Sequence, residues 1–154
     1  MTDSSELNLK LRESYTSWTN ATIRYSDLDP NGHVNNGAFN AFFEDGRVQF
    51  RNDRMISLGE DILTGFVLVK FSVDYLKALH YPGAVDIGTV VTKVGRSSYV
   101  LGQGIFSGDD CAAIAEVITV WFDDETQKSK PIGDELRGIL EGAQKLQQHS
   151  IWHS

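Results

Sequence analysis

Cysteine is almost absent from this chain, because Cys111 carries the only thiol among its 154 residues. A single cysteine excludes an internal disulfide and a metal site built from several thiolates. Long apolar runs are also missing, since no stretch approaches the roughly 20 residues that cross a bilayer. The segment MTDSSELNLKLRES has neither the basic start nor the apolar stretch of a secretory signal. We therefore expect a cytoplasmic protein.

Basic residues are scarce as well. Lys and Arg number 14 against 21 Asp and Glu, which gives a net charge of −7. Phosphates are repelled by such a surface, so the charge disfavours general nucleic-acid binding. The sequence also lacks a P-loop, a G-x-G-x-x-G and a G-x-S-x-G motif, which makes a phosphate loop or a serine-hydrolase elbow a poor prediction.

The length and composition fit one globular domain. A chain of 154 residues with 41% hydrophobic content is long enough to bury a core of its own. We expect a single domain over residues 1–154, with its core at about 15–146 and less ordered ends.

Five segments have the composition of strands. Runs rich in β-branched and aromatic residues occupy 15–25, 66–75, 84–94, 98–106 and 112–122. Glycine-containing turn signals separate the later runs, which predicts an antiparallel meander. In the second run, alternation places one set of side chains on a common face: Val67, Val69, Phe71, Val73 and Tyr75.

Residues from 37 onward have helical periodicity instead. Phe39, Phe43, Gly46 and Phe50 recur at intervals of four, three and four, and Phe42 widens this apolar stripe. Glycine in mid-helix predicts close packing against a flat surface such as a sheet. Polar residues off the stripe include Glu44 and Arg47, which could form an i,i+3 pair.

A shorter helix is expected at the C-terminal end. It begins with Asp134 as a plausible N-cap, and its apolar positions are helically spaced: Leu136, Ile139, Leu140, Ala143 and Leu146. Together the elements predict an α+β fold in which five antiparallel strands wrap one long helix.

The polar segment SDLDPNGHVNN, residues 26–36, precedes the long helix. Its first half resembles the calcium loop D-x-[DN]-x-[DN]-G-x5-E, but Ala38 occupies the position of the closing glutamate. Calcium binding is therefore disfavoured. One histidine without a second nearby ligand also makes a poor metal site.

The order of these elements and the segment RYSDLDPNGHVNNGAFNAFFEDGR resemble the hotdog-fold acyl-CoA thioesterases of the 4-hydroxybenzoyl-CoA thioesterase type. The resemblance extends over about residues 16–140. It implies a hotdog fold, with Asp29 as the catalytic carboxylate and the backbone N–H of Asn36 as the oxyanion donor. It also implies a homodimer or homotetramer joined edge to edge, with active sites between subunits. Gly133 replaces the proline that this family usually has before the last helix.

The chemistry of these residues suits thioester hydrolysis. A carboxylate can attack a thioester carbonyl or activate water, because the thiolate leaves readily. The first N–H groups of a helix are unpaired and carry partial positive charge, so they suit an oxyanion. Asp29 and Asp27 could equally be turn residues, and for Asp27 the turn is the favoured interpretation.

The remaining site residues have alternatives of the same kind. His33 could position substrate or make a structural hydrogen bond, and Asn35 could bind substrate or only cap the helix. An acidic chain needs a local cationic patch to bind the phosphates of coenzyme A, and the resemblance directs attention to a turn containing Arg96, Ser97 and Ser98. That turn could instead be an ordinary solvated one.

We expect an acyl-CoA thioesterase that binds a small-molecule acyl-CoA. It needs no cofactor, since coenzyme A is part of the substrate, and neither nucleic acid nor membrane is a partner. The alternative is a non-catalytic hotdog module, or one that binds acyl-carrier thioesters without hydrolysing them.

Overall fold

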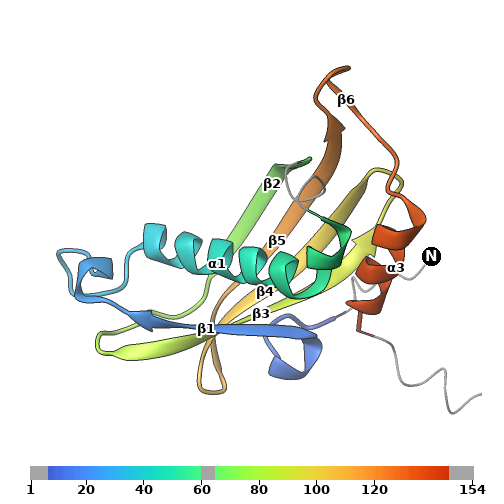
Figure 1. Ribbon diagram of the computed structural model, residues 1–154. Helices are drawn as coiled ribbons and strands as arrows, with labels where there is room; N and C mark the ends of the chain where they lie inside the picture. Colours follow the sequence, from blue (N-terminus) through green and yellow to red (C-terminus); the bar gives the residue numbers. More distant parts are fainter. Residues whose placement is uncertain (1–6, 60–64, 146–154) are drawn as a thin grey trace, which may run out of the picture.

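The computed structural model describes residues 7–59 and 65–145. A long helix, α1 (Asn36–Met55), lies across one face of an antiparallel sheet, as Figure 1 shows. The sheet contains β1 (Ser17–Ile23), β2 (Phe66–Tyr75), β3 (Gly83–Val94), β4 (Ser98–Ser107) and β5 (Asp110–Asp123). Smaller elements are η1 (Arg12–Ser14), η2 (Tyr25–Asp27), η3 (Ile56–Leu58), β6 (Lys128–Ser129) and a C-terminal helix, α3 (Asp134–Gly142). The predicted α+β hotdog arrangement is confirmed.

The strands follow the order β1-β3-β4-β5-β2, and every neighbouring pair is antiparallel. β3, β4 and β5 form the predicted meander. The prediction was wrong for β2, which pairs with β5 at the sheet edge instead of with β3. Residues 76–82 can carry the chain back across the sheet, because seven extended residues reach about 23 Å. β6 pairs with β5, and with no other strand in the part of the chain that the structure describes.

The predicted alternation along β2 was wrong in its first half. A β-bulge shifts the register between Leu68 and Lys70, and one extra residue exchanges the faces to which the side chains point. Val67 and Val69 are therefore 45% and 52% exposed. Phe71 packs against the core as predicted, as does Val73, whereas Tyr75 is exposed at the strand end.

The apolar stripe of α1 is buried as predicted, including Phe39, Phe42, Phe43 and Phe50. Gly46 faces the sheet so closely that a Cβ atom there would lie 2.6 Å from Ile87 Cγ2. The close approach inferred from this glycine is thus confirmed.

The C-terminal helix begins one residue away from its predicted cap. Gly133 is the N-cap, and Asp134 lies inside the first turn, where its charge favours the positive end of the helix dipole. Leu136, Leu140 and Ala143 are buried, and Ile139 packs partly buried against them. Leu146 and the tail fall outside the described residues. Within those residues, no helix is long and apolar enough to span a membrane.

Candidate functional site

The polar segment between β1 and α1 folds back on itself as a narrow hairpin. Leu28 and Val34 pair across it, and the Asp29 N–H donates to the carbonyl oxygen of His33 at 2.8 Å. At the tip, Gly32 has a φ of 80°, a conformation that favours glycine. The hairpin therefore returns the chain directly to the start of α1.

Asp27 is a structural residue of this hairpin. Its side chain is buried and accepts hydrogen bonds from the Arg24 backbone N–H at 2.8 Å and from the Arg24 guanidinium at 3.0 Å. Burial alone raises the pKa of Asp27, but these hydrogen bonds outweigh it and hold the pKa below its usual value. The geometry favours the turn interpretation that the sequence suggested for this acid.

Asp29 uses only one carboxylate oxygen within the described chain. Its Oδ1 accepts from the N–H of Asn31 at 2.9 Å and from the N–H of His33 at 3.1 Å. These bonds fix the carboxylate on the hairpin, and no hydrogen bond to Oδ2 is found among the described residues. The side chain is partly exposed. Asp29 thus stabilises the turn while keeping one oxygen open to solvent or to a ligand.

Asn35 caps α1 and ties the helix start to the hairpin. Its Oδ1 accepts from the Ala38 N–H at 2.7 Å, and its Nδ2 donates to the Asp27 carbonyl oxygen at 2.9 Å. The N–H groups of Asn36 and Gly37, the first two of the helix, have no hydrogen-bond partner among the described residues. Two polarised donors therefore face outward next to the hairpin that carries Asp29.

His33 meets a second histidine that the sequence analysis did not single out. Its backbone forms an isolated bridge with His80, and the two imidazole rings lie edge to face with centroids 5.2 Å apart. Both side chains are exposed. No group of three metal-binding side chains exists among the described residues.

A cavity of about 340 Å³ lies beside this pair, at the end of the sheet near the hairpin. One of the glycine-containing turn signals, Tyr81-Pro82-Gly83, falls in this region, and the sequence indicated only a turn there. The peptide bond between Tyr81 and Pro82 is cis. Much of the lining comes from the segment before β3 and the starts of β3 and β5: Lys77, Leu79, His80, Pro82, Asp110 and Ala112.

Arg96, Ser97 and Ser98 lie away from the hairpin within one chain. Arg96 and Ser97 lie in the turn between β3 and β4, and Ser98 is the first residue of β4. This turn packs beside α3 at the other end of α1 (Figure 1). The Ile132 N–H donates to the Arg96 carbonyl oxygen at 2.8 Å, and the Arg137 guanidinium donates to the preceding glycine carbonyl at 2.9 Å. A single chain therefore does not bring this turn together with Asp29.

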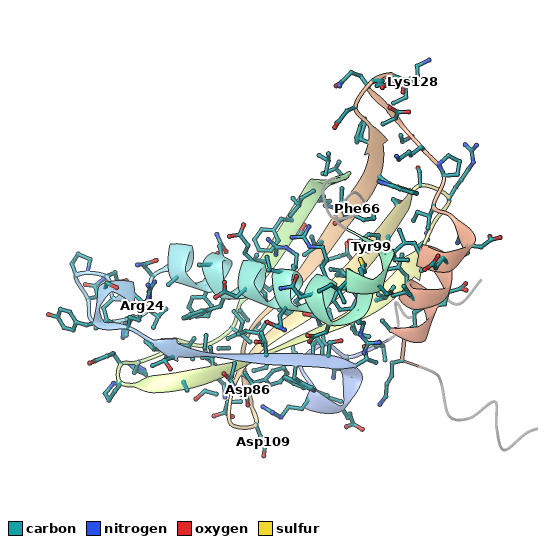
Figure 2. The ribbon with its side chains drawn as sticks, in the orientation of Figure 1. Arg24, Phe66, Asp86, Tyr99, Asp109 and Lys128 are labelled. Carbon is teal, nitrogen blue, oxygen red and sulfur yellow. The ribbon has the colours of Figure 1, made fainter. Side chains whose placement is uncertain are left out.

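A second cavity, of about 160 Å³, opens between α1 and the sheet. Figure 2 labels Phe66 and Tyr99 in this region and Arg24 at the hairpin end. No salt bridge joins Glu44 to Arg47 among the described residues, so the predicted i,i+3 pair does not form as an ion pair. The lining residues come from α1, β2, β4 and β5: Glu44, Arg47, Arg51, Phe66, Leu68, Tyr99, Leu101 and Thr119.

The thioesterase-like superfamily model matches residues 23–140, which is more than half of the chain. No curated protein sequence matches this chain significantly.

Solved structures that resemble this chain include proteins named as thioesterases. The PA5185 protein from Pseudomonas aeruginosa is 28% identical, with a TM-score of 0.76 over 90% of this chain and 98% of its own. A thioesterase from Thermus thermophilus, solved with coenzyme A and zinc, is 26% identical, with a TM-score of 0.75 over 85% of this chain and 96% of its own. YbaW, a probable thioesterase from Escherichia coli, is 25% identical, with a TM-score of 0.72 over 83% of this chain and 98% of its own.

Proposed function

We propose that this chain, which belongs to the thioesterase-like superfamily, hydrolyses acyl-CoA thioesters to the free acid and coenzyme A. The family and the solved neighbours identify it as a thioester hydrolase. The Thermus thermophilus thioesterase, solved with coenzyme A, supports coenzyme A as the thiol half of the substrate.

The observation that carries the proposal is the position of Asp29 on the hairpin that leads into the start of α1. The hairpin register places Asp27 opposite the helix cap, Asn35, through the hydrogen bond from the Asn35 N–H to the Asp27 carbonyl oxygen. Asp29 lies two residues further along the same arm, a displacement of roughly 7 Å in extended chain. A small carbonyl group can therefore lie between the Asp29 carboxylate and the first N–H groups of α1.

In this proposal the Asn36 N–H receives the thioester oxygen as negative charge develops on it. Asp29 either attacks the carbonyl carbon or removes a proton from the attacking water. The carbon–sulfur bond then breaks and the thiolate of coenzyme A leaves. The balance is one water and one thioester consumed, one carboxylic acid and one thiol formed, so no cofactor is required.

The other candidate residues complete the proposed site. His33 and Asn35 flank the reacting group, and Asn35 also holds the helix start in place. Arg96, Ser97 and Ser98 contact the phosphates of coenzyme A from a second subunit, because one chain keeps them away from Asp29. The proposal therefore includes a homodimer, and two such dimers could associate into a homotetramer. It also keeps the cytoplasmic location expected from the sequence.

Asp29→Asn is the decisive variant. Asparagine keeps the Oδ1 acceptor for Asn31 and His33, so the turn should survive, while the charge and basicity are lost. We expect kcat to fall by at least ~10²–10⁴-fold with a smaller change in KM, since the group acts mainly in the transition state. The measurement is thiol release from a panel of acyl-CoAs, with thermal unfolding run in parallel.

Asp27→Asn is the matched control. It removes the same charge two residues away, and we expect it to lower stability more than turnover, because Asp27 binds Arg24 and not the substrate. A folded Asp29→Asn protein with near wild-type turnover would overturn the catalytic assignment. A wild-type protein that cleaves no thioester would instead favour the non-catalytic or carrier-binding module. Single turnover in ¹⁸O-water separates the two chemical routes, because label in the Asp29 carboxylate requires direct attack.

A further inference from the structure

The cavity between α1 and the sheet contains more positive than negative charge. Arg47 and Arg51 line it from α1, and Glu44 is the one acidic residue among the described residues that line it, while aromatic and aliphatic side chains supply most of the remaining wall. Its volume of about 160 Å³ is close to that of cavities that accept a benzene-sized group. The cavity thus combines an apolar wall with an excess cation.

Arg47 has no acidic partner among the described residues. Its guanidinium is half-buried, donates to Gln103 Oε1 at 3.2 Å and lies 5.1 Å from the centre of the Phe71 ring. Burial lowers the pKa of Arg47, which the charge of Glu44 only partly offsets. A partly desolvated cation whose contacts are an amide and a ring is a favourable place for an incoming anion.

Tyr99 adds a neutral donor to the same cavity. Burial raises the pKa of Tyr99 to about 12, despite the nearby arginines. The phenol therefore stays protonated at neutral pH, so it adds no negative charge to this cavity.

The cavity lies along the same part of α1 that begins at the candidate oxyanion site. Asn36, Asn40 and Glu44 are spaced by four and exposed, so they form one face of the helix. β2 runs beside this face, because the Tyr75 hydroxyl donates to Asn40 Oδ1 at 3.0 Å and Phe66 lines the cavity. A substrate group bound at Asn36 can extend along this face to Arg47.

We propose that the cavity binds an anionic far end of the acyl group, so that the enzyme prefers acyl-CoAs whose acyl chain ends in a second carboxylate. This inference rests on the proposed thioesterase function. Gln103 sets the reach, because its Nε2 donates to the Phe43 carbonyl oxygen while its Oε1 accepts from Arg47. The Arg47 guanidinium therefore lies near the level of Phe43, about 10 Å along the helix from Asn36. An extended chain covers that distance in roughly eight or nine bonds.

The test compares two thioesters of matched length, the mono-CoA ester of octanedioic acid and nonanoyl-CoA. We expect wild-type kcat/KM to be higher for the dicarboxylic substrate. Arg47→Met should lower the ratio of kcat/KM for the dicarboxylic substrate to kcat/KM for nonanoyl-CoA by about 10- to 100-fold, which is the effect of one lost charge-assisted hydrogen bond. Arg47→Lys should retain part of the ratio, and Glu44→Gln should raise it, because that change removes the negative charge that Glu44 brings to the cavity.

Arg54→Met is the control within α1. Arg54 donates to Ser17 Oγ and the Thr16 carbonyl oxygen outside the cavity, so its loss should leave the ratio unchanged. The ratio is independent of the fraction of protein that is folded. If Arg47→Met fails to fold, the same ratio can be measured for Arg51→Met and Glu44→Gln. A wild type that prefers nonanoyl-CoA, or a ratio unmoved by the cavity variants, would overturn this inference alone. Failure to cleave either thioester would overturn the proposed function instead.

Discussion

At the scale of single residues, two aspartates two positions apart have different environments. Asp27 is buried and both of its oxygens accept hydrogen bonds from Arg24. Asp29 is partly exposed and, within the described residues, only its Oδ1 accepts hydrogen bonds, both from backbone N–H groups. Environment rather than residue type therefore separates a structural acid from a candidate reactive one.

The lowered pKa of Asp27 predicts an acid-dependent contribution to stability. Because the pKa is lower in the folded than in the unfolded chain, the stabilisation is fully present above the ordinary value of about 3.9 and is lost as pH falls through the folded-state value. Asp27→Asn should thus be less stable than wild type at pH 7, and the difference should shrink as pH falls below about 4. Urea unfolding between pH 7 and pH 2 measures this, and a constant difference would contradict the assigned pKa.

Sequence reasoning at the residue level reaches furthest where the contacts are local, and the catalytic and binding roles stay predictions. The carboxylates, the cap at Asn35 and the helix start all lie within one short segment, so their arrangement follows from turn and cap rules. His80 and Tyr99 were missed, because each reaches its partners through strand pairing with residues far away in the chain. No short motif encodes such contacts.

At the scale of elements, α1 depends on one close approach to the sheet. A Cβ atom at Gly46 would lie 2.6 Å from Ile87 Cγ2 and 2.9 Å from Gln103 Nε2. Gly46→Ala should therefore destabilise the protein by about 1–3 kcal/mol through overpacking. Gly138→Ala in α3 is the matched control, because nothing lies within 4 Å of its Cβ position; it should be neutral or stabilise by up to ~1 kcal/mol. Chemical denaturation of both variants measures the contrast, and equal effects would show that α1 can move away from the sheet.

The elements also show why the sequence predicted some features and not others. The apolar stripe of α1 could be predicted from the sequence, because phenylalanines repeat along the one helix face that the sheet buries. The placement of β2 could not, because pairing with β5 instead of β3 depends on where a seven-residue connection crosses the sheet. The β-bulge in β2 could not be predicted either, because Val69 is a valine like Val67 and nothing in its residue type marks it as the extra residue.

At the scale of the whole molecule, β2 is one of the two edge strands of the sheet, and β1 is the other. No further strand pairs with the outer side of β2 among the described residues, and Val67, Leu68 and Val69 are each 45–52% exposed. An exposed apolar edge strand has unpaired backbone groups that can pair with the same strand of a second copy of this chain. The same assembly would supply the β3–β4 turn that a single chain keeps distant from Asp29.

A shared site predicts complementation between two impaired variants. If Asp29 of one subunit acts with Arg96 of its partner, a heterodimer of Asp29→Asn and Arg96→Ala contains one doubly altered site and one intact site. Random mixing should then restore about a quarter of wild-type sites, because half of the dimers are mixed and the two-fold axis makes their sites reciprocal. Activity is measured at substrate concentrations below KM, where the loss of Arg96 has most effect, and light scattering verifies the dimer. Lys128→Ala, at the exposed β6 hairpin (Figure 2), replaces Arg96→Ala in the control mixture and should alter activity only by dilution. A monomer, or verified heterodimers without recovery, would contradict a site formed by two chains.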